Sequence, residues 1–593
     1  MKVCMQKKGC IKVCIENRKI WKISKKEEVM KQNRRSAARI MFQLAGLLKP
    51  LWGIMSIAVA TGVIGFLFSF GISMFGAYAI LKSLDWGNLS KVPFGTWSLH
   101  AYFIAMAICA FFRGLLHYIE QYCNHFIAFH ILAEIRVRLF KVMRRLAPAK
   151  MDGENQGNLI SMITGDIELL EVFYAHTVSP ILIACVTTIF LFLYYLGLHW
   201  IYAIYALLGQ IFVGILVPWI ASRKASTVGM KVRNEIGNLN GEFLDKLRGL
   251  REVVQYRRGK EMVARISSLT DHLCEGQREL RNQMALVQVW TDSAIIFVSL
   301  FQLILSVFLV SSGMVGMEAA ILAGVLQVGS FAPYINLANL GNILSQTFAC
   351  GERVLSLMEE KPAVEDSENA EEISMGNLRV DNLHFEYRNG RQQQVLKGVN
   401  LEIKPGEIVG IMGPSGCGKS TLLKLMMRFW DADAGTISLG GKNIKEAKRS
   451  SLYSHYNYMT QSTSLFTGTI QDNLLVAKPE ASEEEIMEAL KKASFYDYVM
   501  SLPDKLQTVV EEGGKNFSGG ERQRIGLARC FLADRSIFFL DEPTSNLDVQ
   551  NEAIILKSLM QERKDKTIIL VSHRLSTLGV CDRILKMEQG QLV

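Results

Sequence analysis

Long apolar runs dominate the first 350 residues, and a different pattern follows from residue 376 onwards. Six runs reach the length of about 20 residues that a helix needs to cross a bilayer; they are residues 51–82, 101–127, 168–197, 200–221, 286–312 and 318–346. From residue 376 on, short apolar strands alternate with helices. The pattern predicts a six-span helical membrane domain (41–350), a linker (351–375, acidic and aperiodic in 360–374) and a soluble α/β domain (376–593).

The distribution of Lys and Arg predicts the orientation of the spans. Two long connections, about 128–167 and 222–285, are basic, whereas 83–100, 196–199 and 313–317 are short and poor in Lys and Arg. Basic loops stay on the cytoplasmic side, so both termini are predicted to be cytoplasmic. We expect a multi-pass protein of a prokaryotic plasma membrane, with the α/β domain in the cytoplasm.

The net charge of +10 resides mostly in the first residues. Residues 1–36 hold twelve Lys/Arg and three Asp/Glu, which gives +9. We interpret residues 1–40 as a basic cytoplasmic segment that faces anionic membrane lipid, because an apolar span follows soon afterwards. This interpretation is favoured over binding of nucleic acid. The first 40 residues contain no apolar stretch typical of a cleavable signal peptide.

The two long basic connections keep a helical period. Leu132, Ile135 and Leu139 continue the second span past the membrane edge, and a helix over about 100–147 would be ~70 Å long. We therefore expect the spans to extend into the cytoplasm and turn back near Asp152–Asn158 and Leu247–Tyr256, where they would rest on the soluble domain. The eleven cysteines show no metal-binding spacing. Cys4, Cys10 and Cys14 fit a reduced cytosolic tail, with metal capture as the alternative.

The soluble domain contains a complete phosphate-binding loop between a predicted strand and a predicted helix. Glycines let the backbone approach phosphates, whose charge meets backbone N–H groups and a helix N-terminus. Lys419 supplies a charge to the β- and γ-phosphates, and Ser420 a hydroxyl to Mg²⁺. The predicted ATP-binding residues are Gly413, Pro414, Ser415, Gly416, Cys417, Gly418, Lys419, Ser420 and Thr421.

Further motifs follow in a fixed order. They are Phe517-Ser-Gly-Gly-Glu521, the apolar strand that ends in Asp541-Glu542, Ser545–Asp548, and His573 after another strand. With the six spans, this order resembles ABC half-transporters of the type IV exporter fold over essentially the whole of 41–593. Phe517 and Glu521 replace the usual Leu and Gln, and Asn546 stands where Ala is commoner.

The resemblance implies a role for each motif. Tyr387 would stack on adenine, Asp541 and Gln461 would join Ser420 around Mg²⁺, and Glu542 would be the general base. Gln461 would also touch the attacking water, and His573 would reach the γ-phosphate. Ser518, Gly519, Gly520 and Glu521 would cap the ATP held by a second subunit. The chain is thus expected to hydrolyse ATP as part of a dimer.

A narrower resemblance concerns the second and third spans. Tyr118, Glu120, His125, Phe129, Leu132-Ala133, Arg136-Val137, Phe140, Leu146–Ala149, Gly157–Leu159 and Asp166–Leu169 are similar to the CydC half of the CydDC family. That family implies a heterodimer that moves thiols such as cysteine and glutathione, or haem, for assembly of cytochrome bd. His117, Gln121, Phe126 and His130 depart from its pattern.

Span two also carries an aromatic stripe that contains a histidine. Tyr118, Tyr122, His125 and Phe129 share one helical face, with Arg113, His117 and Glu120 on a neighbouring polar stripe. We interpret His125, Tyr118 and Tyr122 as a candidate substrate site, with His125 as a haem ligand because imidazole suits iron. The alternative is structural pairing and hydrogen bonding between helices, since ionisable residues in spans usually face the interior.

The sequence therefore predicts an ATP-driven transporter subunit of CydC-like type that moves a small-molecule substrate. A homodimeric exporter of lipid, peptide or drug is the alternative within the same class. Two other classes remain: a soluble ATPase acting on nucleic acid or ribosomes, which the six spans disfavour, and an ATP-gated channel or regulator.

Overall fold

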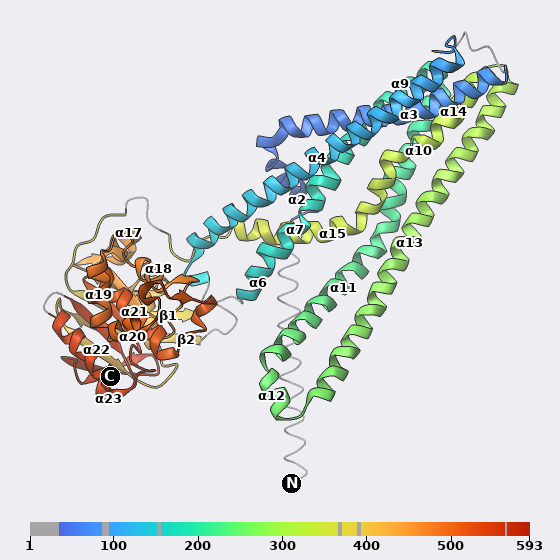
Figure 1. The fold of residues 1–593 in the computed structure, drawn as a ribbon. Helices are drawn as coiled ribbons and strands as arrows, with labels where there is room; N and C mark the ends of the chain where they lie inside the picture. Colours follow the sequence, from blue (N-terminus) through green and yellow to red (C-terminus); the bar gives the residue numbers. More distant parts are fainter. Residues whose placement is uncertain (1–34, 86–93, 151–155, 366–369, 388–392, 564–565) are drawn as a thin grey trace. The chain divides into compact units, whose positions relative to one another are not determined.

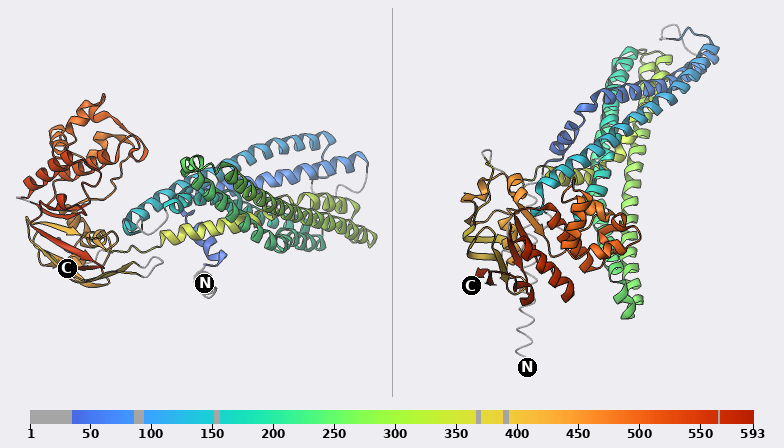
Figure 2. Two further views of the ribbon diagram at one scale, coloured as in Figure 1. Left: turned by 90° about the horizontal axis from the view of Figure 1, so that it is seen from below. Right: turned by 60° about the vertical axis from the view of Figure 1, so that its left-hand side comes forward.

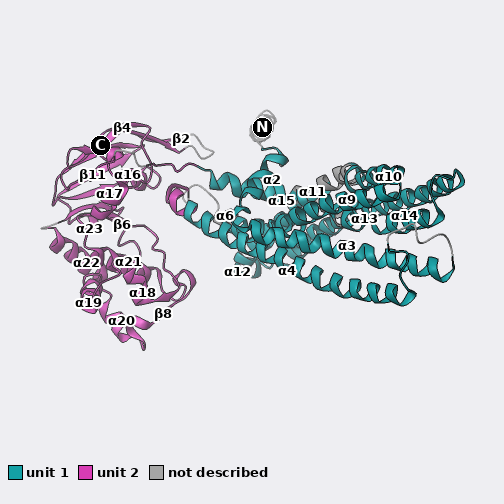
Figure 3. Cartoon of the chain, turned by 90° about the horizontal axis from the view of Figure 1, so that it is seen from above, with its two compact units in different colours: residues 1–142, 156–360 teal, residues 143–155, 361–593 magenta. Residues whose placement is uncertain are grey.

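The computed structural model describes residues 35–85, 94–150, 156–365, 370–387, 393–563 and 566–593. Most of the basic segment 1–40 and its three cysteines therefore lie outside the described residues. The chain divides into two compact units, residues 1–142 with 156–360, and residues 143–155 with 361–593 (Figure 3). The first unit is helical, and the second contains the strands.

The helical unit contains all six predicted apolar segments as helices. Five are long and apolar enough to cross a membrane, and Trp200–Leu216 is a shorter apolar helix. The helices are α2 (Ala37–Gly46), α3 (Trp52–Ser83), α4 (Leu99–Leu146), α6 (Gln156–Ser161), α7 (Ile167–Leu169), α8 (Glu171–Phe173), α9 (Ser179–Leu198), α10 (Trp200–Ile211), α11 (Val217–Arg248), α12 (Leu250–Gln255), α13 (Gly259–Ser311), α14 (Met317–Gly329) and α15 (Ala332–Met358). Short π-helical turns, η3 (Met162–Asp166), η4 (Tyr174–Val178) and η5 (Phe212–Leu216), join several of them.

Within the described residues, the long connections are largely helical, as the sequence predicts. Helices α11 and α13 pack side by side (Figure 1), and α12 reverses the chain between them. This reversal falls within the predicted turn at Leu247–Tyr256. The two further views in Figure 2 show the same long hairpin. The other predicted turn, near Asp152–Asn158, lies partly outside the described residues.

Two predicted boundaries are wrong in detail. The expected span 318–346 is two helices, because α14 ends at Gly329 and α15 starts anew at Ala332 with Pro333 in its first turn. Proline has no backbone N–H to donate to the preceding turn, so it favours a helix start. Helix α15 then continues to Met358, so residues 351–358 of the expected linker are helical.

Charged side chains join the ends of several of these helices. Arg35, which precedes α2, lies 2.6 Å from a Glu359 oxygen and 3.3 Å from a Glu352 oxygen. Buried Asp166 lies 3.1 Å from Arg353 of α15 and 3.7 Å from Arg233 of α11. Three segments that are distant in sequence are therefore joined at one carboxylate.

The second unit contains a mainly parallel six-stranded sheet in the order β12-β11-β3-β10-β9-β6. An antiparallel sheet follows the order β2-β1-β4-β5, and β7 pairs with β8. The strands are β1 (Leu378–Tyr387), β2 (Gln393–Ile403), β3 (Ile408–Met412), β4 (Ala434–Leu439), β5 (Lys442–Asn443), β6 (Tyr456–Met459), β7 (Gly468–Thr469), β8 (Val509–Val510), β9 (Ile537–Asp541), β10 (Thr567–Val571), β11 (Arg583–Glu588) and β12 (Gln591–Leu592).

The central strands are apolar throughout because helices cover the parallel sheet. Every residue of β9 and β10 is buried, and Phe538 and Phe539 belong to two different core clusters. The helices of this unit are α16 (Lys419–Met426), α17 (Arg449–His455), α18 (Ile470–Leu475), α19 (Glu483–Lys492), α20 (Tyr496–Ser501), α21 (Gly519–Ala533), α22 (Val549–Glu562) and α23 (Leu575–Leu578).

Candidate functional site

Parallel pairing brings the candidate catalytic residues to one edge of the six-stranded sheet. Val571 of β10 pairs with Ile411 of β3 on one side and with Asp541 of β9 on the other. The segments that follow these three strands therefore emerge together. Ligands of open α/β sheets bind outside this carboxyl edge.

The loop after β3 has a backbone that its glycines make accessible. Gly416 and Gly418 adopt φ values of +80° and +112°, a region that residues with a side chain disfavour. A Cβ atom on Gly413 would clash with the carbonyl oxygen of Met587. The loop then enters α16 directly at Lys419, so its N–H groups and the helix start form one anion-binding surface.

Lys419 is held under this loop. Its Nζ donates hydrogen bonds to the carbonyl oxygens of Gly413 at 2.8 Å and Pro414 at 3.0 Å, and its side chain is buried. The Tyr387 and Thr421 hydroxyls lie 3.3 Å apart, which places the predicted adenine-stacking residue beside the same helix. Tyr387 also makes edge contacts with Trp430 and Phe385.

The residues expected to hold Mg²⁺ supply oxygen ligands. Asp541 is only 4% exposed, and burial raises the pKa of its carboxyl, with the Glu542 charge adding to the rise. A hydrogen bond from Ser420 and the charge of Lys419 act in the opposite direction. A buried carboxylate beside a hydroxyl and cations fits Mg²⁺, which prefers hard oxygen ligands and keeps several waters. The ion, when bound, would neutralise charge on the phosphates.

Glu542 is contacted from two sides. Gln461 Nε2 donates to its Oε2 at 3.1 Å, and His573 Nδ1 lies 3.2 Å from its Oε1. The backbone of Glu542 has φ +52°, a sparsely populated conformation for a residue with a side chain, of the kind that clusters at functional sites. The structure therefore brings the three predicted catalytic residues together around one carboxylate, where a water attacking a phosphate could lose its proton.

The Ser-Gly-Gly motif forms the start of α21. The Ser518 hydroxyl accepts from the Glu521 N–H at 3.3 Å, and the Glu521 carboxylate accepts from the Ser518 N–H at 2.7 Å. This reciprocal pair is a capping box. Glu521, which replaces the usual Gln, therefore stabilises the start of α21.

Two residues that the sequence analysis missed connect these motifs. Gln523 of α21 donates to the Glu542 carbonyl at 2.7 Å and accepts from the Asn546 N–H at 3.1 Å. Arg574 donates to the carbonyl oxygens of Ser545 at 3.0 Å and Thr544 at 3.2 Å. The sequence signal that could have found them is their position next to a motif. Gln523 comes shortly after the Ser-Gly-Gly motif, and Arg574 directly follows His573.

In the helical unit, the predicted substrate residues lie apart from the polar pocket. Tyr118 and Tyr122 are 68% and 62% exposed. His125 Nδ1 lies 3.2 Å from Glu171, and the His125 ring meets His176 edge-on at 5.4 Å. A pocket of about 550 Å³ nearby is lined by Phe66, His117, Glu120, Gln121, Ala175, His176, Pro180, Ile183 and Pro333. His176 lines this pocket and also contacts His125.

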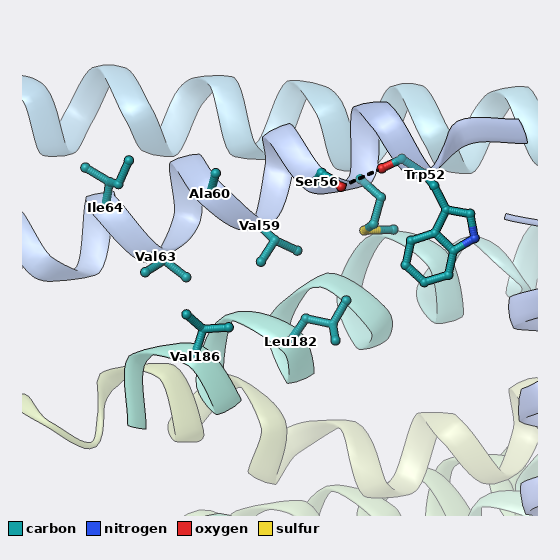
Figure 4. A pocket seen from close by; sticks show the side chains of 9 residues that line it. Trp52, Ser56, Val59, Ala60, Val63, Ile64, Leu182 and Val186 are labelled. Atoms are coloured by element: carbon teal, nitrogen blue, oxygen red, sulfur yellow. Dashed lines mark hydrogen bonds between the residues drawn. The ribbon is translucent and has the colours of Figure 1, made fainter. Parts of the chain in front are cut away.

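A second pocket is an apolar groove between α3 and α9. Leu182 and Val186 of α9 face Val59 and Val63 of α3 across it (Figure 4). Ser56, which also lines it, donates its hydroxyl hydrogen to the Trp52 carbonyl at 2.8 Å. This internal hydrogen bond leaves an apolar surface, as expected for helices in a bilayer.

Comparison with known proteins identifies the class. Residues 51–332 match the family model for the ABC transporter transmembrane region, and residues 396–545 match the ABC transporter model. The chain is 39% identical over 560 residues to a Haemophilus influenzae protein named "Probable ABC transporter ATP-binding/permease protein", covering 94% of this chain and 100% of that one. The chain belongs to the ABC transporter family, as a half-transporter with an ATPase coupled to transport.

Other relatives and a solved structure agree with this class. An ATP-dependent lipid A-core flippase of Shewanella frigidimarina is 29% identical and covers 83% of this chain and 82% of its own. A Staphylococcus aureus protein whose name assigns it to multidrug export is 30% identical, with 90% and 93% covered. A bacterial Atm1-family ABC exporter with ATP bound has a TM-score of 0.76 at 22% identity, covering 93% of this chain and 95% of that one. The exporter fold is thereby confirmed.

Proposed function

We propose that two copies of this chain form an exporter that moves an amphipathic small molecule across the plasma membrane at the expense of ATP. The contacts around Glu542 support this most strongly. Gln461 and His573 both bond to its carboxylate, and the phosphate loop and Asp541 follow neighbouring strands. One chain holds every element of a hydrolytic site.

A second subunit is needed because each chain also presents the start of α21. Gly519 and Gly520 follow the Ser518 cap in the first turn of α21, and the first N–H groups of a helix have no acceptor within the helix, which favours an anion there. A single γ-phosphate does not need two such sites, so we infer that Ser518 completes the ATP site of the other subunit. Because both motifs are intact here, two identical copies suffice, in preference to the expected heterodimer.

The proposed ATP reaction uses residues of this chain in defined roles. Lys419 and the loop N–H groups would hold the phosphates, and Asp541, Ser420 and Gln461 would hold Mg²⁺, whose charge would stabilise the phosphates. Glu542 polarises the attacking water, and His573 contacts the γ-phosphate. We infer that hydrolysis separates the ATP-binding domains of the two subunits and that this movement drives the change in the spans.

Purified chain in proteoliposomes tests this function. We expect Mg²⁺-dependent ATPase activity, a dimer by light scattering, and ATP-dependent accumulation of an amphipathic dye in inside-out vesicles. The Glu542→Gln variant should bind ATP and accumulate nothing. ATPase activity from a stable monomer, or dye accumulation without ATP, would contradict the proposal.

The second candidate function is that of a CydC-like transporter of thiols or haem, and the sequence resemblance at residues 118–169 supports it. His125 and His176 place two imidazoles near Glu171, which favours neither a thiol nor haem by itself. No support for haem comes from the family match, and Tyr118 and Tyr122 do not line the polar pocket. Stimulation of the ATPase by glutathione or cysteine, or a Soret band lost in His125→Ala, would favour this candidate over the homodimeric exporter.

A further inference from the structure

The polar pocket of the helical unit contains a buried carboxylate. The pocket of about 550 Å³ opens among α3, α4, η4 with α9, and α15. Its volume lies within the range of small-molecule sites. Among its lining residues Glu120 is the sole Asp, Glu, Lys or Arg, and Glu120 is 5% exposed.

The hydrogen bond of Glu120 does not join two helices. Its Oε2 lies 3.2 Å from Nδ1 of His117, three residues earlier on α4. An imidazole in the tautomer that donates through Nδ1 is neutral, and in that tautomer the pair keeps the negative charge of an ionised carboxylate. Carboxylates in spans are costly and usually mark a substrate or ion pathway when they do not serve packing.

Apolar residues of α3 and α9 lie very close to Glu120. Gly62 of α3 faces it, and a Cβ atom there would lie 3.2 Å from Glu120 Cδ and would clash with Ile183. Phe66 follows one turn later on α3 and lines the pocket with Pro180. A cation with an apolar body would find a counter-ion and an aromatic face in the same pocket.

A second polar group lies one turn further along α4. Asn124 is fully buried, and in the described part of the chain neither its Nδ2 nor its Oδ1 has a hydrogen-bond partner. Residues four apart share a helix face, so Asn124 lies on the side of α4 that carries Glu120. A buried amide without partners is unfavourable, so this face of α4 carries a second unsatisfied polar group next to the pocket, although Asn124 does not line it.

In the expected orientation, with Leu99 at the outer end of α4, the pocket lies towards the inner leaflet. Glu120 is ~30 Å along α4 from Leu99, at 1.5 Å per residue. Since the bilayer core is ~30 Å thick, a molecule that partitions into the cytoplasmic leaflet reaches this depth directly.

We propose that this pocket binds amphipathic organic cations, with Glu120 as the counter-ion and His117, Gln121 and His176 as hydrogen-bonding neighbours. The proposal rests on the exporter function and specifies its substrate class. Anionic thiols and phosphorylated lipids would place negative charge beside Glu120, and the lining residues contain no Lys or Arg to compensate.

Equilibrium binding without ATP tests the site in the full chain, purified in nanodiscs. Ethidium is the probe because its fluorescence rises in an apolar site. Octylamine should displace ethidium, and octanol, which has the same chain without the charge, should not. Glu120→Gln should weaken ethidium binding about tenfold or more, because a charge-assisted contact is lost. Glu134→Gln, on the same helix but paired with exposed Arg138, should bind as the wild type does.

A second variant guards against a folding defect. Gln121→Lys places a competing cation at a partly exposed lining position and should also weaken ethidium binding. Equal affinity of Glu120→Gln and wild type, or equal displacement by octanol and octylamine, would overturn the proposal. ATPase activity is measured in parallel: an active enzyme without Glu120-dependent binding refutes the site alone, whereas an inactive wild type refutes the exporter function.

Discussion

Gln461 donates a hydrogen bond from Nε2 to Oε2 of Glu542 at 3.1 Å. The two residues follow β6 and β9, which pair in parallel with Met459 opposite Leu540. His573, after β10, contacts the other oxygen of the same carboxylate. The segments after three strands thus hold one carboxylate between an amide and an imidazole. If this carboxylate is the proposed base, changes at Glu542 should affect the hydrolysis step more than nucleotide binding.

Glu542→Gln should lower the ATPase rate about 10²- to 10⁴-fold, because the attacking water loses its general base. ATP affinity should change little, since the phosphate loop is untouched. Single-turnover hydrolysis and filter binding measure the two effects. Lys419→Ala is the matched comparison: it should lose ATP affinity, because a charge-assisted phosphate contact disappears. A Glu542→Gln enzyme with wild-type turnover would remove Glu542 from the mechanism.

Ser518 has a structural and a proposed catalytic task, which two substitutions separate. Ser518→Ala removes the α21 cap and should lower the free energy of unfolding by about 1 kcal/mol. Ser518→Asp keeps a good capping residue but brings a negative charge to the proposed phosphate of the other subunit. We expect Ser518→Asp to be as stable as wild type in thermal unfolding and nearly inactive. Normal activity of this variant would show that Ser518 does not face a nucleotide.

Arg574 should act as a positioning residue for the segment after Glu542. Its guanidinium donates to the carbonyls of Ser545 and Thr544 and lies 3.3 Å from Glu552. Arg574→Lys keeps the charge but loses the fork of donors. We expect kcat to fall several-fold while the ATP dissociation constant stays within twofold. Arg583→Lys on β11 is the surface control. A variant that weakens ATP binding and leaves kcat unchanged would contradict this role.

The raised pKa of Asp541 predicts the pH dependence of Mg²⁺ binding. Burial disfavours its charged form, so protonation begins at a higher pH than for an ordinary aspartate. Because Mg²⁺ requires the carboxylate, apparent Mg²⁺ affinity should decline as pH falls through this raised pKa. Mg²⁺ titrations of the ATPase at stepped pH values measure the decline. An Asp541→Asn variant should bind Mg²⁺ weakly at every pH, and a persistent decline in that variant would assign the effect to another group.

Much of this architecture was predictable because strong local signals coincide with it. The apolar runs exceed the length of a bilayer-crossing helix, and the loop at Gly413–Thr421 follows an apolar strand. The break between α14 and α15 was missed because apolar composition continues across Ser330, where only Pro333 signals a new helix. The expected linker at 351–375 began too early because its first residues still pack as part of α15.

In the candidate sites, too, some residues were predictable from the sequence and others were not. Lys419, Glu542 and His573 belong to motifs whose order is readable, and the parallel pairing places them together. Gln523 and Arg574 act through backbone carbonyls and N–H groups of distant segments, which no residue pattern reveals. In the spans, the sequence singled out Tyr118, Tyr122 and His125, whereas the pocket is lined by His117, Glu120 and Gln121 of α4. The rotation of α4 about its own axis, relative to α3 and α9, decides whether its aromatic stripe or its polar stripe faces the pocket.

A mixed dimer tests the central claim, that two copies of this chain share each ATP site. Lys419→Ala homodimers and Ser518→Asp homodimers should both be inactive, since every site carries one defect. In a mixed dimer of the two, purified through two different tags, one site combines both defects and the other combines an intact Lys419 with an intact Ser518 from opposite chains. We predict that its ATPase rate in proteoliposomes recovers to a substantial fraction of wild type. A mixed dimer as inactive as either parent would contradict the shared site.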